Sequence, residues 1–568
     1  MAFNLSVPEC YVEVYPFEGG GQQYEIQGGQ ILSCTVTKAI RTSESAFEIE
    51  LAPGGPNGPN RPPVWSDIVT PISFVLIGMA RGQYRQIVMI GVITNIIEST
   101  RFEGRTVQRV TVLIGKDFTY FFETFNYVVL AYLGLAYSAI GQSLGNANLG
   151  FPAILSGRYL DGPPDQLGQN WYQGVMDGTD GILAKTTISY QGNRLSFSDV
   201  LAVYFEKFPN FSIPLGDMYL PSQGSWLEKF RIIFEWPWYE FFVTTAPVGF
   251  YPDPSGGDWN TVAQGTQFTM RGIGAQYPSV PVAIARKNPL PHITMQASND
   301  SFTPGQIDTT DWQGLNGGTI FYNDPTPDAG FIESTIRFSE EEVRNFYLLN
   351  PRWSLAMLGI DNASVTPALF VFLAADDAAS LHRYGYRPAI METHWFNDVP
   401  PGNTAQKNAG NKQDFQSTYG DLLSRLFSYY EPTSLMMRGS VKAALRPDIM
   451  PGCIFQYNPF KSEGAWQFYI DGFVHKYEFG GRSTTTLHLS RGLPAEVYGD
   501  SGLLTDIHLG KASRVNGGYQ SGLPSEAGGS QSEGLRIVNL AQNVQQVLND
   551  FGKIYTTAQT QTGTTSGQ

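Results

Sequence analysis

Apolar and polar residues alternate along the first part of the chain. Phe47, Ile49 and Leu51 are separated by two glutamates, which is the period-two pattern of a strand with one buried face. Three more stretches rich in β-branched residues follow, with glycines at the turns near them: 72–79, 87–97 and 107–114. Five or six strands at this spacing predict a closed or nearly closed antiparallel barrel.

The pattern becomes irregular after about residue 120. Phe122–Ile140 predicts a buried helix, and Ser222–Phe242 carries apolar residues at helical spacing. Pro237 is expected to end or bend this second helix. Strand signals return after about residue 388, where five strand-like segments and one helix predict a second barrel-like domain.

The last part of the chain combines a Gly/Ser-rich linker with an amphipathic segment. Six apolar residues follow the a and d positions of a heptad repeat, and four of them are β-branched, which favours three or more strands in a coiled coil: Ile537, Leu540, Val544, Val547, Phe551 and Ile554. Two interpretations stay open. The stripe forms contacts between subunits or with a partner, or it is one helix that packs on its own subunit.

These patterns predict a β-rich, multidomain α+β protein. Its two antiparallel barrels are joined by irregular α+β domains, and a helix lies near the C-terminus. The composition agrees, because charged residues make up only 15% and glycine and proline are frequent. The expected domains are an N-terminal barrel, an α+β domain, an α+β linking domain, a second barrel and a linker with helix and disordered tail: 1–120, 121–255, 256–387, 388–495 and 496–568.

The net charge of −14 argues against tight binding of nucleic acid, which needs Lys and Arg to neutralise phosphates. An acidic conduit would instead let DNA slide past. The apolar stretch Tyr127–Ile140 is shorter than the roughly 20 residues that span a bilayer. The N-terminus has no secretory pattern. We therefore expect no membrane span.

Motifs for catalysis or cofactor binding are absent or out of context. The three cysteines and six histidines show no metal-ligand spacing. The one GxSxG match, Gly141–Gly145, follows a helix-like run instead of a strand, which is the wrong frame for a nucleophile. The acidic run Glu340–Glu342 is interpreted as a helix N-terminus. The sequence thus predicts no cofactor, no metal site and no catalytic residue, and indicates a protein that is not an enzyme.

Two other functions stay open on the residues alone. A pair of carboxylates suited to peptidoglycan hydrolysis leaves no sequence signature. The aromatic residues between Trp226 and Phe242 could form a sugar platform of a host-binding adhesin, although a buried core or subunit interface is the favoured interpretation.

The order of several segments resembles the hub proteins of bacteriophage tails. In the first barrel the similar segments are Cys34–Leu51, Trp65–Gly78, Val88–Phe102 and Val110–Asp117. In the second barrel the match is stronger: Gly439–Phe455 is similar to the hub pattern of a strand, Arg-Pro-Asp and a turn glycine. Phe468–Pro494 is similar to the final hairpin, and Gly224–Val243 to the helix that precedes a shared aromatic strand.

This resemblance implies a structural hub in the virion, at the tail tip or baseplate, assembled in the cytoplasm of the host bacterium. Members of the family form threefold rings in which each subunit supplies two tube-like barrels, so that three subunits mimic a sixfold ring. The implied partners are two further copies in a homotrimer, a tail tube or distal tail protein, and a central spike. They extend to a tape measure protein and a baseplate wedge. Genomic DNA would pass through the lumen without specific binding.

Overall fold

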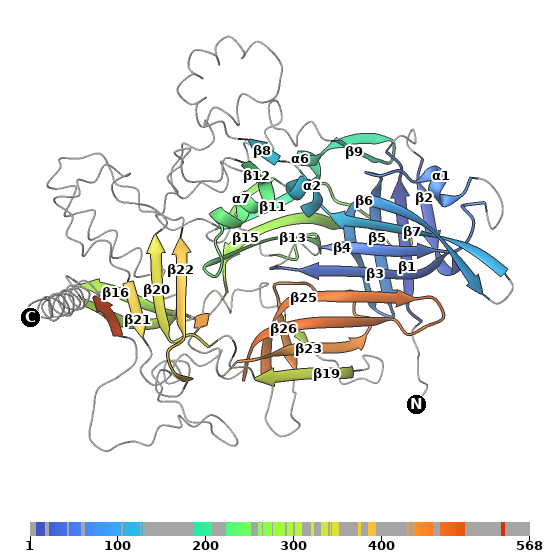
Figure 1. Cartoon of the computed structure of the whole chain (residues 1–568). Helices are drawn as coiled ribbons and strands as arrows, with labels where there is room; N and C mark the ends of the chain where they lie inside the picture. Colours follow the sequence, from blue (N-terminus) through green and yellow to red (C-terminus); the bar gives the residue numbers. More distant parts are fainter. Residues whose placement is uncertain are drawn as a thin grey trace, which may run out of the picture.

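In the residues that it describes, the computed structural model is β-rich, and its helices are few and short (Figure 1). The residues that it describes are 7–17, 22–41, 45–57, 63–103, 106–124, 126–128, 187–206, 223–251, 259–263, 265–274, 277–289, 292–298, 301–308, 320–322, 331–338, 341, 343–351, 373–376, 384–393, 426, 429–430, 436–457, 466–494 and 536–539.

The predicted N-terminal strands form a curled antiparallel sheet. Its elements are β1 (Glu9–Tyr15), β2 (Tyr24–Gln27), η1 (Gly28–Gln30), β3 (Ile31–Ala39), β4 (Ala46–Leu51), α1 (Trp65–Ile68), β5 (Phe74–Arg81), β6 (Tyr84–Glu103) and β7 (Thr106–Asp117). The alternation predicted in β4 is confirmed: Phe47, Ile49 and Leu51 are buried, whereas Glu48 is exposed. The blue strands on the right of Figure 1 belong to this curled sheet.

Two cysteines show how far the sheet curls. Strands β1 and β3 are not neighbours in the strand order, yet burial and a hydrogen bond to the Cys34 thiol raise the pKa of Cys10 well above its ordinary value. Both thiols are buried and free. The sequence spacing gave no sign of this pair, because the contact depends on the curvature of the sheet.

The C-terminal strands continue the same sheet. They are β18 (Ile320–Tyr322), β19 (Phe331–Phe338), β23 (Met437–Ala444), β24 (Ile454–Tyr457), β25 (Trp466–Glu478) and β26 (Thr484–Pro494). Strand β25 pairs antiparallel with β3, from Gly472 opposite Ala39 to Glu478 opposite Ser33. Among the described residues this pairing, here called the seam, joins the strands of the predicted first barrel and those after residue 437 of the predicted second barrel into one sheet of 13 strands, drawn mainly in blue and orange in Figure 1. The first strand expected in the second barrel, β22 (Pro388–Thr393), lies in another sheet, whereas β18 and β19 of the predicted linking domain belong to this one.

Two buried side chains beside the seam make polar contacts, although the His475 Nε2 atom has no hydrogen-bond partner among the described residues. Lys38 Nζ lies 2.7 Å from Asp117 Oδ2, and both side chains are almost fully buried. On β25, His475 Nδ1 lies 2.8 Å from the Thr485 hydroxyl, which also accepts a hydrogen bond from the Arg446 N–H. Burial lowers the pKa of His475 to about 3, so this imidazole is neutral near neutral pH.

A second sheet packs on the first through an aromatic core. It consists of β11 (Ala202–Glu206), β13 (Tyr239–Pro247), β14 (Trp259–Ala263) and β15 (Ser279–Lys287). The Thr245 hydroxyl accepts a hydrogen bond of 2.9 Å from the Ile90 N–H of β6. Trp238, Tyr239 and Phe241 are buried in this core, and Phe242 is buried in the core of the large sheet. The interpretation as buried core is confirmed for these four residues, whereas Trp236 is only partly buried and the side chain of Trp226 lies outside the described part.

The helices are shorter than predicted. Within Ser222–Phe242 the helix α7 (Trp226–Ile233) begins at a capping box formed by Ser225 and Glu228, and Pro237 follows its end. Within Phe122–Ile140, α2 (Thr119–Thr124) ends before β8 (Asn126–Val128), which pairs with β12 (Gln223–Ser225). Within the helix predicted over Phe122–Ile140, residues 122–124 are helical, but the prediction is wrong at Asn126–Val128, which form a strand. Residues 129–140 lie outside the described part.

The remaining described strands form smaller units. They are β9 (Thr187–Tyr190), β10 (Asn193–Ser196) with α6 (Phe197–Val200), the hairpin β16 (His292–Ser298) and β17 (Ser301–Asp308), and a four-stranded sheet of β20 (Phe346–Pro351), β21 (Leu373–Asp376), β22 (Pro388–Thr393) and β27 (Arg536–Asn539). No helix in the described part of the chain is long and apolar enough to cross a membrane.

The seam leaves no room for a side chain at Gly472. A Cβ atom there would lie 2.3 Å from the Lys38 carbonyl oxygen and 3.0 Å from the Ala39 Cα atom, both backbone atoms. Gly472→Ala should therefore destabilise the protein by about 1–3 kcal/mol through overpacking, seen as a lower midpoint of thermal unfolding. Gly29→Ala is the matched control, because its Cβ would meet only the Phe479 ring, at 3.3 Å, and that ring is exposed. Equal midpoints for the two variants would contradict a tight seam.

Candidate functional site

The structure describes only one residue, Ile537, of the apolar heptad stripe predicted near the C-terminus. Ile537 lies in β27, where it pairs with Ala375 of β21. The start of the predicted helix is thus a strand, in keeping with the β-branched pair Ile537 and Val538. Leu540, Val544, Val547, Phe551 and Ile554 lie outside the described residues.

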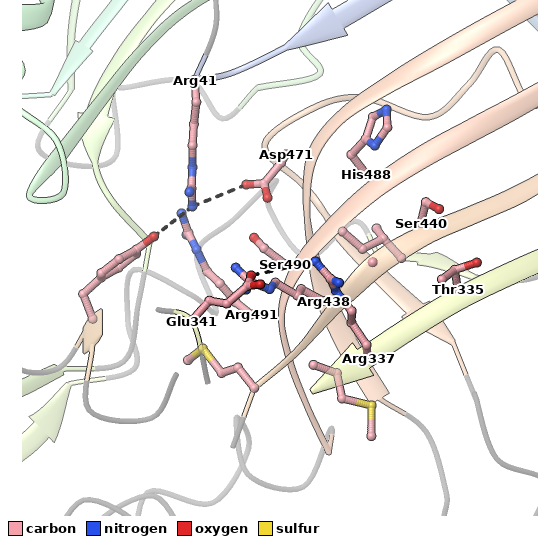
Figure 2. A pocket seen from close by; sticks show the side chains of 15 residues that line it. Arg41, Thr335, Arg337, Glu341, Arg438, Ser440, Asp471, His488, Ser490 and Arg491 are labelled. Atoms are coloured by element: carbon pink, nitrogen blue, oxygen red, sulfur yellow. Dashed lines mark hydrogen bonds and ion pairs between the residues drawn. The ribbon is translucent and has the colours of Figure 1, made fainter. Parts of the chain in front are cut away.

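A pocket lined by several arginines lies at the end of the large sheet that carries β19. Its volume is about 510 Å³, which is within the range of ligand pockets. Figure 2 shows its side chains. The described residues that line it are Arg41, Thr335, Arg337, Glu341, Tyr429, Met436, Met437, Arg438, Gly439, Ser440, Asp471, His488, Leu489, Ser490 and Arg491.

Three neighbouring strands supply one polar wall of this pocket. Register places Thr335 of β19 opposite Ser440 of β23, and Ser440 opposite His488 of β26. Arg337 lies opposite Arg438 in the same way. Because side chains two residues apart share one face of a strand, the wall is a set of cross-strand neighbours that are far apart in the sequence.

The acidic residue of this wall holds two arginines. Glu341 Oε2 lies 3.0 Å from Arg438 Nη2 and 3.9 Å from Arg337 Nη2. Glu341 follows β19 in a turn. The interpretation of Glu340–Glu342 as a helix N-terminus is wrong at this residue; the other two glutamates lie outside the described part. The side chains of Glu341 and Arg337 are 72% and 65% exposed, so solvent screens this pair.

The opposite side of the pocket is fixed at the seam. Arg41 follows the end of β3, and its Nη2 donates a hydrogen bond of 2.9 Å to the Tyr429 hydroxyl. The same guanidinium lies 3.8 Å from Asp471 Oδ1 and stacks 4.1 Å from the centre of the Trp236 ring. Asp471 is the extra residue of a bulge in β25, and bulges commonly re-aim a side chain. Figure 2 shows Arg41 and Asp471 pointing toward each other.

Arg491 connects the pocket to the buried core. Its φ of 55° is uncommon for a residue other than glycine, and the register of β26 against both neighbours shifts at this point. The guanidinium stacks 4.0 Å from the centre of the Tyr469 ring, and its Nη1 donates to the Pro289 carbonyl at 3.0 Å. The bulge therefore turns a cation inward and stacks it on aromatic faces.

Beneath Tyr469 lies a buried ion pair between the two sheets. Arg286 Nε donates to Glu240 Oε1 at 2.7 Å, and its Nη2 donates to the Gly452 carbonyl at 2.6 Å. The Tyr469 hydroxyl donates to the Glu240 carboxylate at 2.6 Å. Arg286 and Glu240 lie in the second sheet, whereas Tyr469 lies in β25 of the first sheet and Gly452 lies in the turn before β24. This network therefore ties the second sheet to the sheet that forms the pocket.

The ionisation of this network follows from its burial. Burial alone would lower the pKa of Arg286, but the adjoining Glu240 carboxylate more than offsets this and raises it above its ordinary value. Burial, followed by the Glu240 charge, raises the pKa of the Tyr469 hydroxyl well above its ordinary value. Arg286 thus stays charged and Tyr469 stays protonated at physiological pH, which is the state that the hydrogen bonds require.

The chemistry of the pocket is recognition of an anion. Four arginines and two carboxylates line it, and guanidinium groups match the geometry of carboxylates and phosphates. In the described part of the chain, no group of three or more His, Cys, Asp or Glu side chains is arranged to hold a metal ion. No local sequence pattern indicates this site, because Arg41, Arg337, Arg438 and Arg491 meet only through long-range strand pairing.

Removing one partner of the buried ion pair should cost far more than removing a surface one. Glu240→Gln leaves the Arg286 charge buried without its carboxylate and should destabilise the protein by about 3–5 kcal/mol. Glu25→Gln is the control: it breaks a pair whose carboxylate side chain is 42% exposed and should cost at most about 1 kcal/mol. Urea unfolding of both variants measures the difference. Similar midpoints would show that the buried pair does not hold the two sheets together.

Comparisons with known proteins give matches only among solved structures. No family model matches the sequence, and no curated protein does. A tail protein from Neisseria meningitidis matches over 85% of this chain and 96% of its own, with 10% identity and a TM-score of 0.39. The 43 kDa tail protein of prophage MuSo2 from Shewanella oneidensis matches over 85% and 98%, with 10% identity and a TM-score of 0.37.

The third structure is prophage tail protein gp18 from Listeria monocytogenes, which matches over 88% of this chain and 99% of its own, with 8% identity and a TM-score of 0.32. The chain is thus similar to tail proteins, two of which are prophage proteins.

Proposed function

We propose that this protein is a structural hub of a phage tail, at the tail tip or baseplate, and not an enzyme. The observation that carries the proposal is the seam: strands from 9–117 and from 437–494 form one continuous antiparallel sheet. These are the two strand sets in which the sequence resembles the tube-like barrels of tail hubs. A single subunit therefore presents both sets in a fixed relation.

In the proposed assembly three copies form a ring. Two strand sets per subunit give six similar units around a threefold axis, which suits a protein that connects a hexameric tube to a trimeric spike. Three identical copies related by rotation close without leaving an unpaired interface. The proposed partners are the tail tube or distal tail protein and the central spike, with a tape measure protein and a baseplate wedge as further contacts. The same proposal includes a division of each subunit into five domains, with boundaries after residues 120, 255, 387 and 495.

The charge of the chain supports a passive DNA channel. A net charge of −14 disfavours stable contacts with phosphates. DNA that moves through a lumen would therefore not be held back by binding to the protein wall. The proposed hub would therefore let genomic DNA pass without specific binding. Its place is the virion, after assembly in the cytoplasm of the host bacterium.

The two rival functions give different results in simple assays. A peptidoglycan hydrolase would clear a zymogram that contains peptidoglycan, whereas the proposed hub leaves it intact. A host-binding adhesin would bind whole cells or envelope polysaccharide, and antibodies would reach it at the periphery of intact virions. Clearing of the zymogram by the purified chain would replace the structural proposal with the enzymatic one.

The heptad stripe provides a direct test of trimer formation. If Val544 and its neighbours in the stripe lie at a threefold interface, Val544→Asp places a charge in an apolar contact and should convert trimers to smaller species. Gln545→Asp introduces the same charge one position away from the stripe and should leave the trimer intact. Light scattering across a concentration series measures the mass of each. Trimers in both variants would show that the stripe only packs on its own subunit.

A further inference from the structure

The arginine pocket has an excess of positive charge on an otherwise acidic chain. Arg41, Arg337, Arg438 and Arg491 face Glu341 and Asp471, so four cations against two carboxylates leave two positive charges. The chain as a whole carries −14. Such a local reversal of sign attracts a partner group of negative charge. Every Lys or Arg among the described lining residues is an arginine, the side chain best suited to bidentate binding of carboxylates.

Parts of the pocket are held in place before any ligand arrives. Arg41 is held by Tyr429, Asp471 and the Trp236 ring, and Arg491 is buried against Tyr469. Fixing long side chains in advance reduces the entropy that binding would otherwise cost. The buried network of Glu240 and Arg286 supports Tyr469 from below, so the wall behind Arg491 is rigid.

Glu341 marks the position where a ligand carboxylate fits. Its Oε2 atom lies near both Arg438 and Arg337, at 3.0 Å and 3.9 Å. Since the Glu341 side chain is 72% exposed, the pair is worth at most about 1 kcal/mol. A carboxylate from another molecule can therefore replace it at small cost. Figure 2 shows Glu341 extending toward Arg438 with the pocket around it.

The pocket also offers apolar contacts beside the guanidinium groups. Met436, Met437 and Leu489 line it together with the Tyr429 ring. A volume of about 510 Å³ is far larger than the roughly 30 Å³ that one water molecule occupies in the liquid. A free anion alone would leave most of the pocket unfilled. A short peptide with acidic and apolar side chains matches both kinds of lining.

A nucleic acid is a poorer match to the same features. Binding to a phosphate backbone relies on a stripe or patch of Lys and Arg along a surface, whereas these arginines line a single concavity that includes two carboxylates. The net charge of the chain opposes the approach of a polyanion. Shape and charge together favour an acidic segment of a protein.

We propose that this pocket binds an acidic peptide segment of a partner protein, with one carboxylate between Arg337 and Arg438 and an adjacent apolar side chain against the methionines. In this role Glu341 is an internal competitor for the ligand. The inference concerns the surface of one subunit and does not depend on the trimeric hub. A failure here would leave the proposed function untouched.

Binding of labelled peptides to the full-length protein tests this proposal. The probe is a fluorescent peptide of alternating glutamate and leucine, and the comparison is the same peptide with lysine in place of glutamate. Fluorescence anisotropy should show binding of the glutamate peptide only, and binding should weaken with added salt. Arg438→Gln should weaken it about fivefold, whereas Glu341→Gln should strengthen it by a similar factor of about five.

A matched control separates the pocket from general electrostatics. Arg271→Gln removes a cation whose side chain is 84% exposed and which pairs with Glu25, away from the pocket lining, and should leave binding unchanged. The opposite effects of the Arg438 and Glu341 variants distinguish a binding role from simple loss of stability. Absence of binding, equal binding of the lysine peptide, or an unchanged Arg438→Gln variant would overturn the proposal. Arg438-dependent binding of a single-stranded oligothymidine in preference to the peptide would overturn it in favour of a phosphate site.

Discussion

The pairing of β3 with β25 is the constraint on which the rest of the molecule depends. It brings residues 33–39 against residues 472–478, so the chain must close a very long loop before these backbone groups can pair. Loop closure costs entropy that only later contacts recover. The seam has those contacts: the sheet core continues across it, and beside it the buried Lys38 ammonium and the Nδ1 atom of His475 have partners.

The same pairing builds the pocket. Arg41 lies two residues after the end of β3, and Asp471 comes directly before the part of β25 that pairs with β3. The two side chains meet only because the strands lie side by side. Arg491 reaches the site from the next strand, β26. It stacks on Tyr469, and Tyr469 donates a hydrogen bond to Glu240, so the pocket wall is connected to the buried network. A surface site and an interface between two sheets thus share one framework.

Local patterns in the sequence were sufficient to predict individual strands and helices. The alternation in β4 and the helix within Ser222–Phe242 each depend on residues a few positions apart, and both were predicted, although the helix is shorter than expected. The β-rich multidomain class follows from many such signals. The joining of the two strand sets into one sheet did not, because strand pairing across the seam leaves no local trace. The contact between Cys10 and Cys34 and the cluster of four arginines were hidden for the same reason. At Ile537 the heptad spacing outweighed the β-branched residues in the prediction, whereas the pairing with β21 decided the structure.

Electron microscopy of the purified full-length protein, at the highest concentration that stays monodisperse, is the most direct test of the hub proposal. We expect ring-shaped particles with threefold symmetry and an open axial channel, in which each subunit contributes two similar units to the ring. Single subunits at every concentration, or an oligomer with no channel along its symmetry axis, would contradict it.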